Sequence, residues 1–143
     1  MKTETLRQEK LLRALRYSAI PTTPVPRDAQ RLTMIIQGVI ERFDIHEDLS
    51  ITIGRFDATT RTMADLDLTP YNGVRKGVSR RHARLHIDRG TLYLTDLGSS
   101  NGTFVGGKRL DPNKPVAIRK ENEVLTLGGL NIQLFFRQGE SKA

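Results

Sequence analysis

The sequence predicts an all-β domain, because short strand-like runs follow one another from Leu32 onward without any helical period. Glycine-rich turns separate these runs. Two of the turns, Arg89-Gly90 and Gly128-Gly129, have the two-residue length typical of β-hairpins. Many short strands joined in this way favour a β-sandwich or a barrel. A chain of 143 residues is long enough for one such core and too short for two ordinary domains.

Residues 1–31 form an N-terminal arm ahead of the β-rich region. A leucine repeat at helical spacing predicts a short helix from about Thr5 to Tyr17. Three prolines then exclude a helix interior and predict an extended linker. The linker also carries two adjacent threonines, Thr22 and Thr23, which are accessible candidates for phosphorylation.

Residues 32–136 hold the predicted strands, and residues 137–143 form a short C-terminal tail. The alternation in residues 83–88 places Ala83, Leu85 and Ile87 on one face of a strand. His86 falls on the opposite face, where we expect a solvent-side residue without a functional role. The expected strands cover residues 32–37, 38–45, 50–56, 83–88, 91–97, 102–105, 116–119, 124–128 and 130–136.

The charge of +7 is concentrated in the arm, where seven Lys or Arg face three Asp or Glu. Residues 32–136 carry fourteen basic against twelve acidic residues, a balance that argues against duplex DNA binding by the domain. The absence of cysteine and the wide spacing of three histidines predict neither metal nor cofactor. No apolar run approaches the roughly 20 residues of a membrane span, and no signal peptide is recognisable. We therefore expect a cytoplasmic protein without membrane contact.

Three polar loop segments lie at the ends of predicted strands. In an antiparallel sandwich, loops far apart in sequence gather at the same end of the sheets. Guanidinium groups bind phosphate oxygens as a fork, hydroxyls donate single hydrogen bonds, and an amide can hold a peptide backbone. These segments, residues 54–55, 79–82 and 98–103, thus predict a site for a phosphorylated ligand.

Gly54-Arg55, Ser79-x-x-His82 and Asn101-Gly102, in this order, resemble the forkhead-associated (FHA) domain family. The resemblance covers roughly residues 32–136, and the combination is far more specific than any one motif. It implies a β-sandwich of two antiparallel sheets with about eleven strands. It also implies that loops at one end of the sandwich bind phosphothreonine peptides.

Matched position by position, the resemblance implies two groups of site residues. The ligand group comprises Arg55, Ser79, Arg80, Ser100 and Asn101. Arg55 and Ser79 would bind phosphate, Arg80 and Ser100 would add further contacts, and Asn101 would hold the ligand backbone. The supporting group comprises Gly54, His82 and Gly102. Ser100 stands where the family often has threonine, and residues 56–77 form an extended loop that is long for the family and borders the site.

Two enzymatic readings fit the sequence poorly, so no enzyme is expected. The segment from Gly102 has P-loop spacing up to Lys108, but Arg109 replaces the Ser or Thr that would bind magnesium. Ser79 or Ser100 could in principle act with His82 and Asp96, yet neither serine has the surroundings of a nucleophile elbow.

The function expected from these residues is that of a signalling adaptor that binds phosphothreonine proteins, either a Ser/Thr protein kinase or its substrates. Phosphorylation of Thr22 or Thr23 would let the arm fold back onto the same site. The alternative is a nucleic-acid or anionic-surface binder that uses the basic arm. The arm carries a single aromatic residue, Tyr17, too few for a stacking platform, which makes nucleic acid the weaker alternative.

Overall fold

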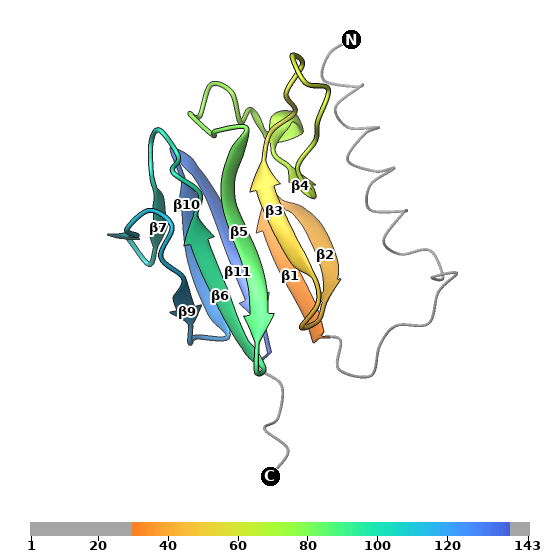
Figure 1. Ribbon diagram of the computed structural model, residues 1–143, viewed down its shortest axis with the longest axis vertical. Helices are drawn as coiled ribbons and strands as arrows, with labels where there is room; N and C mark the ends of the chain where they lie inside the picture. Colours follow the sequence, from red (N-terminus) through yellow and green to blue (C-terminus); the bar gives the residue numbers. More distant parts are fainter. Residues whose placement is uncertain (1–29, 138–143) are drawn as a thin grey trace, which may run out of the picture.

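The computed structural model describes residues 30–137, which fold into two β-sheets packed face to face (Figure 1). One sheet has six strands in the order β2-β1-β11-β10-β7-β8, and the other has five in the order β4-β3-β5-β6-β9. The strands are β1 Gln30–Ile36, β2 Val39–Ile45, β3 Ser50–Gly54, β4 Leu66–Asp67, β5 Arg81–Asp88, β6 Thr91–Asp96, β7 Thr103–Val105, β8 Lys108–Arg109, β9 Val116–Ile118, β10 Asn122–Leu127 and β11 Leu130–Phe136, with a 3-10 helix η1 at Thr69–Tyr71. The predicted helix, the proline linker, Thr22 and Thr23 lie outside the described residues.

The core lies between the two sheets and is built from the inward faces of their strands. Leu32 and Met34 of β1 are fully buried, and so are Ala83 and Leu85 of β5. The alternation predicted for residues 83–88 is therefore confirmed. His86 lies on the outer face of β5 as expected, but it is half-buried and stacks on Tyr93 with ring centres 5.4 Å apart. Burial lowers the pKa of His86, and the neighbouring charge of Arg84 adds to this effect.

Both predicted hairpins are confirmed by the strand register. Arg89-Gly90 joins β5 to β6, whose last pair is Asp88 with Thr91. Gly128-Gly129 joins β10 to β11, whose last pair is Leu127 with Leu130. Local turn chemistry was enough to predict these connections because each turn involves neighbouring residues only.

The two-sheet antiparallel arrangement needs one correction, because β4 runs parallel to β3. The short strands β4 and β8 were not predicted, since two residues are too few to show any periodicity. β1 also begins at Gln30, inside the region that the sequence assigned to the arm, where it pairs with Ile45.

The segment between Arg55 and Ser79 is more than an extended loop. It contains β4 and η1, and it contributes Leu66, Leu68 and Tyr71 to the core, each at most 1% exposed. The Tyr71 hydroxyl donates to the buried carboxylate of Glu41 at 2.6 Å. This segment is therefore fixed to the sandwich on its inner side.

Within residues 30–137, no helix is long and apolar enough to cross a bilayer. The same residues contain no group of three or more histidine or acidic side chains placed to hold a metal ion.

Candidate functional site

Three segments distant in sequence meet at one end of the sandwich, the end where β3 stops and β5 begins (Figure 1). The backbone N–H of Arg55 donates to the carbonyl of Arg80 at 3.1 Å. The N–H of Ser100 donates to Ser79 Oγ at 3.1 Å. The amide of Asn101 donates to a carbonyl in the same 76–80 segment, that of Gly77, at 3.0 Å. The residues of the predicted ligand group are thus neighbours in space.

Arg55 is oriented by the loop that precedes β5. Its Nε donates to the carbonyl of Val78 at 2.8 Å, which fixes the plane of the guanidinium beside Ser79. Its terminal nitrogens have no hydrogen-bond partner among residues 30–137, and the side chain is half-buried. A half-buried guanidinium with unused donors can bind phosphate oxygens in the bidentate manner.

His82 is completely buried and ties two of the segments together. Its Nδ1 accepts from the backbone N–H of Ser79 at 3.0 Å, so this nitrogen carries no proton. The proton therefore sits on Nε2, which donates to the carbonyl of Gly102 at 2.8 Å. Burial lowers the pKa of His82, partly opposed by the Gly102 hydrogen bond and the charge of Asp96. The neutral imidazole is thus a structural bridge.

Gly54 ends β3 at a point where no side chain fits. A Cβ at this position would lie 1.9 Å from the carbonyl oxygen of Arg80. The close approach accompanies a register shift between β3 and β5, in which Gly54 lies opposite Arg81. This contact brings Arg55 directly against the loop that carries Ser79 and Arg80.

A network around Asp96, which the sequence analysis did not assign to the site, organises residues 98–103. Asp96 is 2% exposed. One carboxylate oxygen accepts from the hydroxyls of Ser99 and Thr103, and the other accepts from the N–H groups of Gly98 and Ser99. Burial alone would raise the pKa of Asp96, but the hydrogen bonds from Ser99 and Thr103 outweigh it and the pKa is lowered.

These contacts do not form a relay of Ser79 or Ser100 with His82 and Asp96. His82 meets the backbone of Ser79 and not its hydroxyl, and Asp96 bonds to Ser99 and Thr103. The groups that a serine nucleophile would need are therefore used to hold the loops in place.

A second carboxylate, Asp57, lies against the site and pairs with Arg80. Arg80 Nε is 3.5 Å from Asp57 Oδ1, and the Arg80 side chain is 55% exposed. The pKa of Asp57 is lowered chiefly by the hydroxyl of Thr60, against the opposing effect of burial, and further by the N–H of Thr59 and the charge of Arg80. Arg80, which is predicted to contact the ligand, thus has an acidic partner within the domain.

The β10–β11 hairpin forms a base beneath the loops, a role that its sequence did not indicate. Gly128 N–H donates to the carbonyl of Gly102 at 2.9 Å, and Gly129 N–H donates to the carbonyl of Lys76 at 2.7 Å. The hairpin therefore joins the two loops that carry Ser79 and Asn101.

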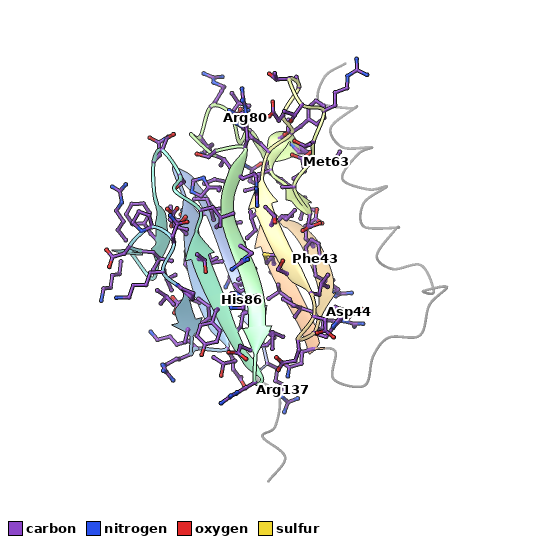
Figure 2. All side chains as sticks on the ribbon, in the orientation of Figure 1. Phe43, Asp44, Met63, Arg80, His86 and Arg137 are labelled. Carbon is purple, nitrogen blue, oxygen red and sulfur yellow. The ribbon has the colours of Figure 1, made fainter. Side chains whose placement is uncertain are left out.

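The predicted ligand and support groups differ in exposure. Arg55 and Ser79 are half-buried, while Arg80, Ser100 and Asn101 are exposed. The supporting residues are all buried, namely Gly54, His82 and Gly102. Figure 2 shows Arg80 and Met63 at the loop end of the molecule, and Asp44 and Arg137 toward the opposite end.

The family model for the FHA domain matches residues 51–128, and the chain belongs to this family. A curated relative, the probable E3 ubiquitin-protein ligase dma1 of Schizosaccharomyces pombe, is 39% identical over 85 residues, which cover 57% of this chain and 30% of that protein. The chain thus spans less than a third of that relative's length.

Solved structures of FHA domains have the same fold. A structure described as an analysis of phosphothreonine-dependent FHA domain interactions superimposes with a TM-score of 0.57 at 25% identity, covering 76% of this chain and 99% of that one. The N-terminal FHA domain of Rad53p from S. cerevisiae, in complex with a phosphothreonine peptide, gives 0.57 at 22% identity, covering 75% of this chain and 94% of that one.

Proposed function

We propose that the domain binds phosphothreonine peptides at the loop end of the sandwich, with Arg55, Ser79, Arg80 and Ser100 on the phosphate and Asn101 on the peptide backbone. The observation that carries this proposal is the hydrogen-bonded junction of three distant segments. It leaves the terminal nitrogens of Arg55 unused within the described chain. Membership of the FHA family supports the same ligand.

The energetics support selection of phosphorylated over bare peptide. A phosphoryl group brings about −1.5 to −2 charges and three acceptor oxygens. Each charge-assisted hydrogen bond contributes roughly 1.5–3 kcal/mol, so two or three of them amount to several orders of magnitude in affinity. A bare threonine offers none of these acceptors, and Arg55 would then stay unpaired.

In the cell, this binding makes the protein a non-enzymatic adaptor in cytoplasmic Ser/Thr kinase signalling, with a kinase or its substrates as partner. Phosphorylation of Thr22 or Thr23 would place a competing ligand on the same chain. A tether of about thirty residues gives such a ligand a high effective concentration at the site. The expected consequence is that the phosphorylated arm excludes external ligands.

The binding proposal is tested by titrating the full chain with a phosphothreonine peptide and with its unphosphorylated form, by calorimetry. Arg55→Ala should abolish phosphopeptide binding. Arg81→Ala is the matched control, because Arg81 is an exposed neighbour at the start of β5. Binding that survives Arg55→Ala but weakens steeply with salt would instead favour the basic arm as a polyanion binder.

The switch is tested by phosphorylating the full chain with a threonine kinase and repeating the titration. Affinity for external phosphopeptide should fall in the wild type and stay unchanged when Thr22 and Thr23 are both replaced by alanine. Equal affinity before and after stoichiometric phosphorylation of the arm would exclude the switch.

A further inference from the structure

Arg109 on β8 lies against the loop that carries Asn101 and Gly102, although it is not part of the FHA motifs. In the β7–β8 ladder it pairs with Phe104, and its guanidinium carbon lies 5.8 Å from the centre of the Phe104 ring. Its Nε, Cζ and one terminal nitrogen would lie 2.9, 3.1 and 3.2 Å from a Cβ at Gly102. The guanidinium therefore lies over Gly102, the residue that follows Asn101.

This guanidinium is held in place but is not neutralised. The ion pairs among residues 30–137 are Arg31 with Asp44 and Arg80 with Asp57, so Arg109 has no carboxylate partner in the part of the chain that the structure describes. The residue is exposed to solvent. Cation–π contact with an aromatic ring orients the plane of an arginine while leaving its N–H donors available.

Gly102, which lies beneath the Arg109 guanidinium, is hydrogen-bonded to the rest of the site. The Gly102 carbonyl accepts from His82 and from the N–H of Gly128, while the N–H of Gly102 donates to Ser99 Oγ at 3.0 Å. The position of Arg109 relative to Asn101 is thus fixed by the same contacts that position Ser79. Because Gly102 directly follows Asn101, the guanidinium lies next to the residue that we propose holds the ligand backbone.

We propose that Arg109 is a specificity-determining residue that binds a carboxylate side chain of the ligand, on the side of the phosphothreonine where the peptide passes Asn101 and Gly102. The inference rests on the proposed phosphothreonine binding. The lack of a side chain at Gly102 leaves room for the guanidinium to lie against the loop that carries Asn101. A fixed arginine fork matches the geometry of a carboxylate.

The test uses a set of phosphothreonine peptides in which each flanking position carries Asp or, in the paired peptide, Asn. The wild-type chain should bind one Asp peptide about fivefold more tightly than its Asn partner, the scale of a solvent-exposed ion pair. Arg109→Gln should remove this preference while leaving affinity for the Asn peptide unchanged. Arg119→Gln, an exposed arginine that follows β9, should leave the preference intact.

Three outcomes would overturn the inference. Equal binding of Asp and Asn peptides at every position by the wild type would do so without any variant. An equal loss for both peptides in Arg109→Gln would show that Arg109 only holds the loop. If no phosphothreonine peptide binds and Arg55→Ala changes nothing, the proposed function fails and this inference fails with it.

Discussion

The two ends of the sandwich are built by different means. At the end opposite the site, Arg89-Gly90 turns the chain between adjacent strands, and the described contact across that end is the N–H of Gly90 with the exposed carboxylate of Glu47 at 3.2 Å. At the site end, the buried side chain of His82 joins Ser79 to Gly102, two segments far apart in sequence, and the buried carboxylate of Asp96 holds the loop of residues 98–103 in shape. A turn satisfies its own backbone, whereas a site made from three loops needs side chains to join them.

The largest expected effect is on the free energy of unfolding. It should appear when glycine is replaced by alanine at the site end, and not when the same replacement is made at the opposite end. Gly54→Ala forces a methyl group to within 1.9 Å of the Arg80 carbonyl. We expect a loss of about 3 kcal/mol in the free energy of unfolding, as for severe overpacking, together with loss of phosphopeptide binding. Gly90→Ala meets no atom within 4 Å but has φ +79°, so it should cost about 1 kcal/mol and spare binding. Urea denaturation of both variants measures the difference. Similar losses in the free energy of unfolding for the two variants would refute the difference between the two ends.

Removing the carboxylate under the site should have the next largest effect. Asp96→Ala leaves the hydroxyls of Ser99 and Thr103 without their shared acceptor, and we expect about 2 kcal/mol of destabilisation with weaker phosphopeptide binding. Glu47→Ala at the opposite end should change stability by no more than about 0.5 kcal/mol. Thermal unfolding and calorimetry check both numbers. An Asp96→Ala chain with unchanged affinity would mean that the network does not position the loop.

Lowering the pH should destabilise the fold through His82 at the site end. The folded-state pKa of His82 lies below its ordinary value of 6.5, so the unfolded chain binds more protons in the interval between them. The free energy of unfolding should therefore be highest above about pH 6.5 and fall as the pH drops toward the folded-state value.

Denaturation midpoints of the wild type and of His82→Gln across this range measure the effect. The variant should show a shallower dependence, with the remaining slope from His86, whose pKa is also lowered by burial. Parallel curves for the two chains would assign the pH dependence to groups other than His82.

The smallest effect concerns the two ion pairs among the described residues. Asp57→Asn removes the partner of Arg80 and should strengthen phosphopeptide binding by about threefold, the scale of an ion pair whose arginine is largely solvated. Asp44→Asn breaks the pair with Arg31 away from the loop end and should leave affinity unchanged (Figure 2). Weaker binding by Asp57→Asn would mean that Asp57 orients Arg80 for the ligand instead of competing for it.

The accuracy of the sequence predictions also differs between the two ends. The strands and the hairpin Arg89-Gly90 followed from alternation and turn residues, which act over a few neighbouring positions. At the site end, the motif residues were predicted from a specific resemblance to a family. The supports under them were not predicted, since the sequence near Gly128 does not show that it contacts Gly102, and the contacts of Asp96 with Ser99 and Thr103 depend on how their loop folds.

The sequence by itself determined which faces of the strands are apolar and where the short turns fall, and it predicted which guanidinium, hydroxyl and amide groups are candidates for binding a phosphorylated ligand. Only the tertiary structure decided that β4 runs parallel to β3, that Asp57 pairs with Arg80, and that Arg109 lies over Gly102. Periodicity and turn chemistry are properties of neighbouring residues. Contacts between distant segments depend on how the two sheets pack, which the local sequence pattern does not predict.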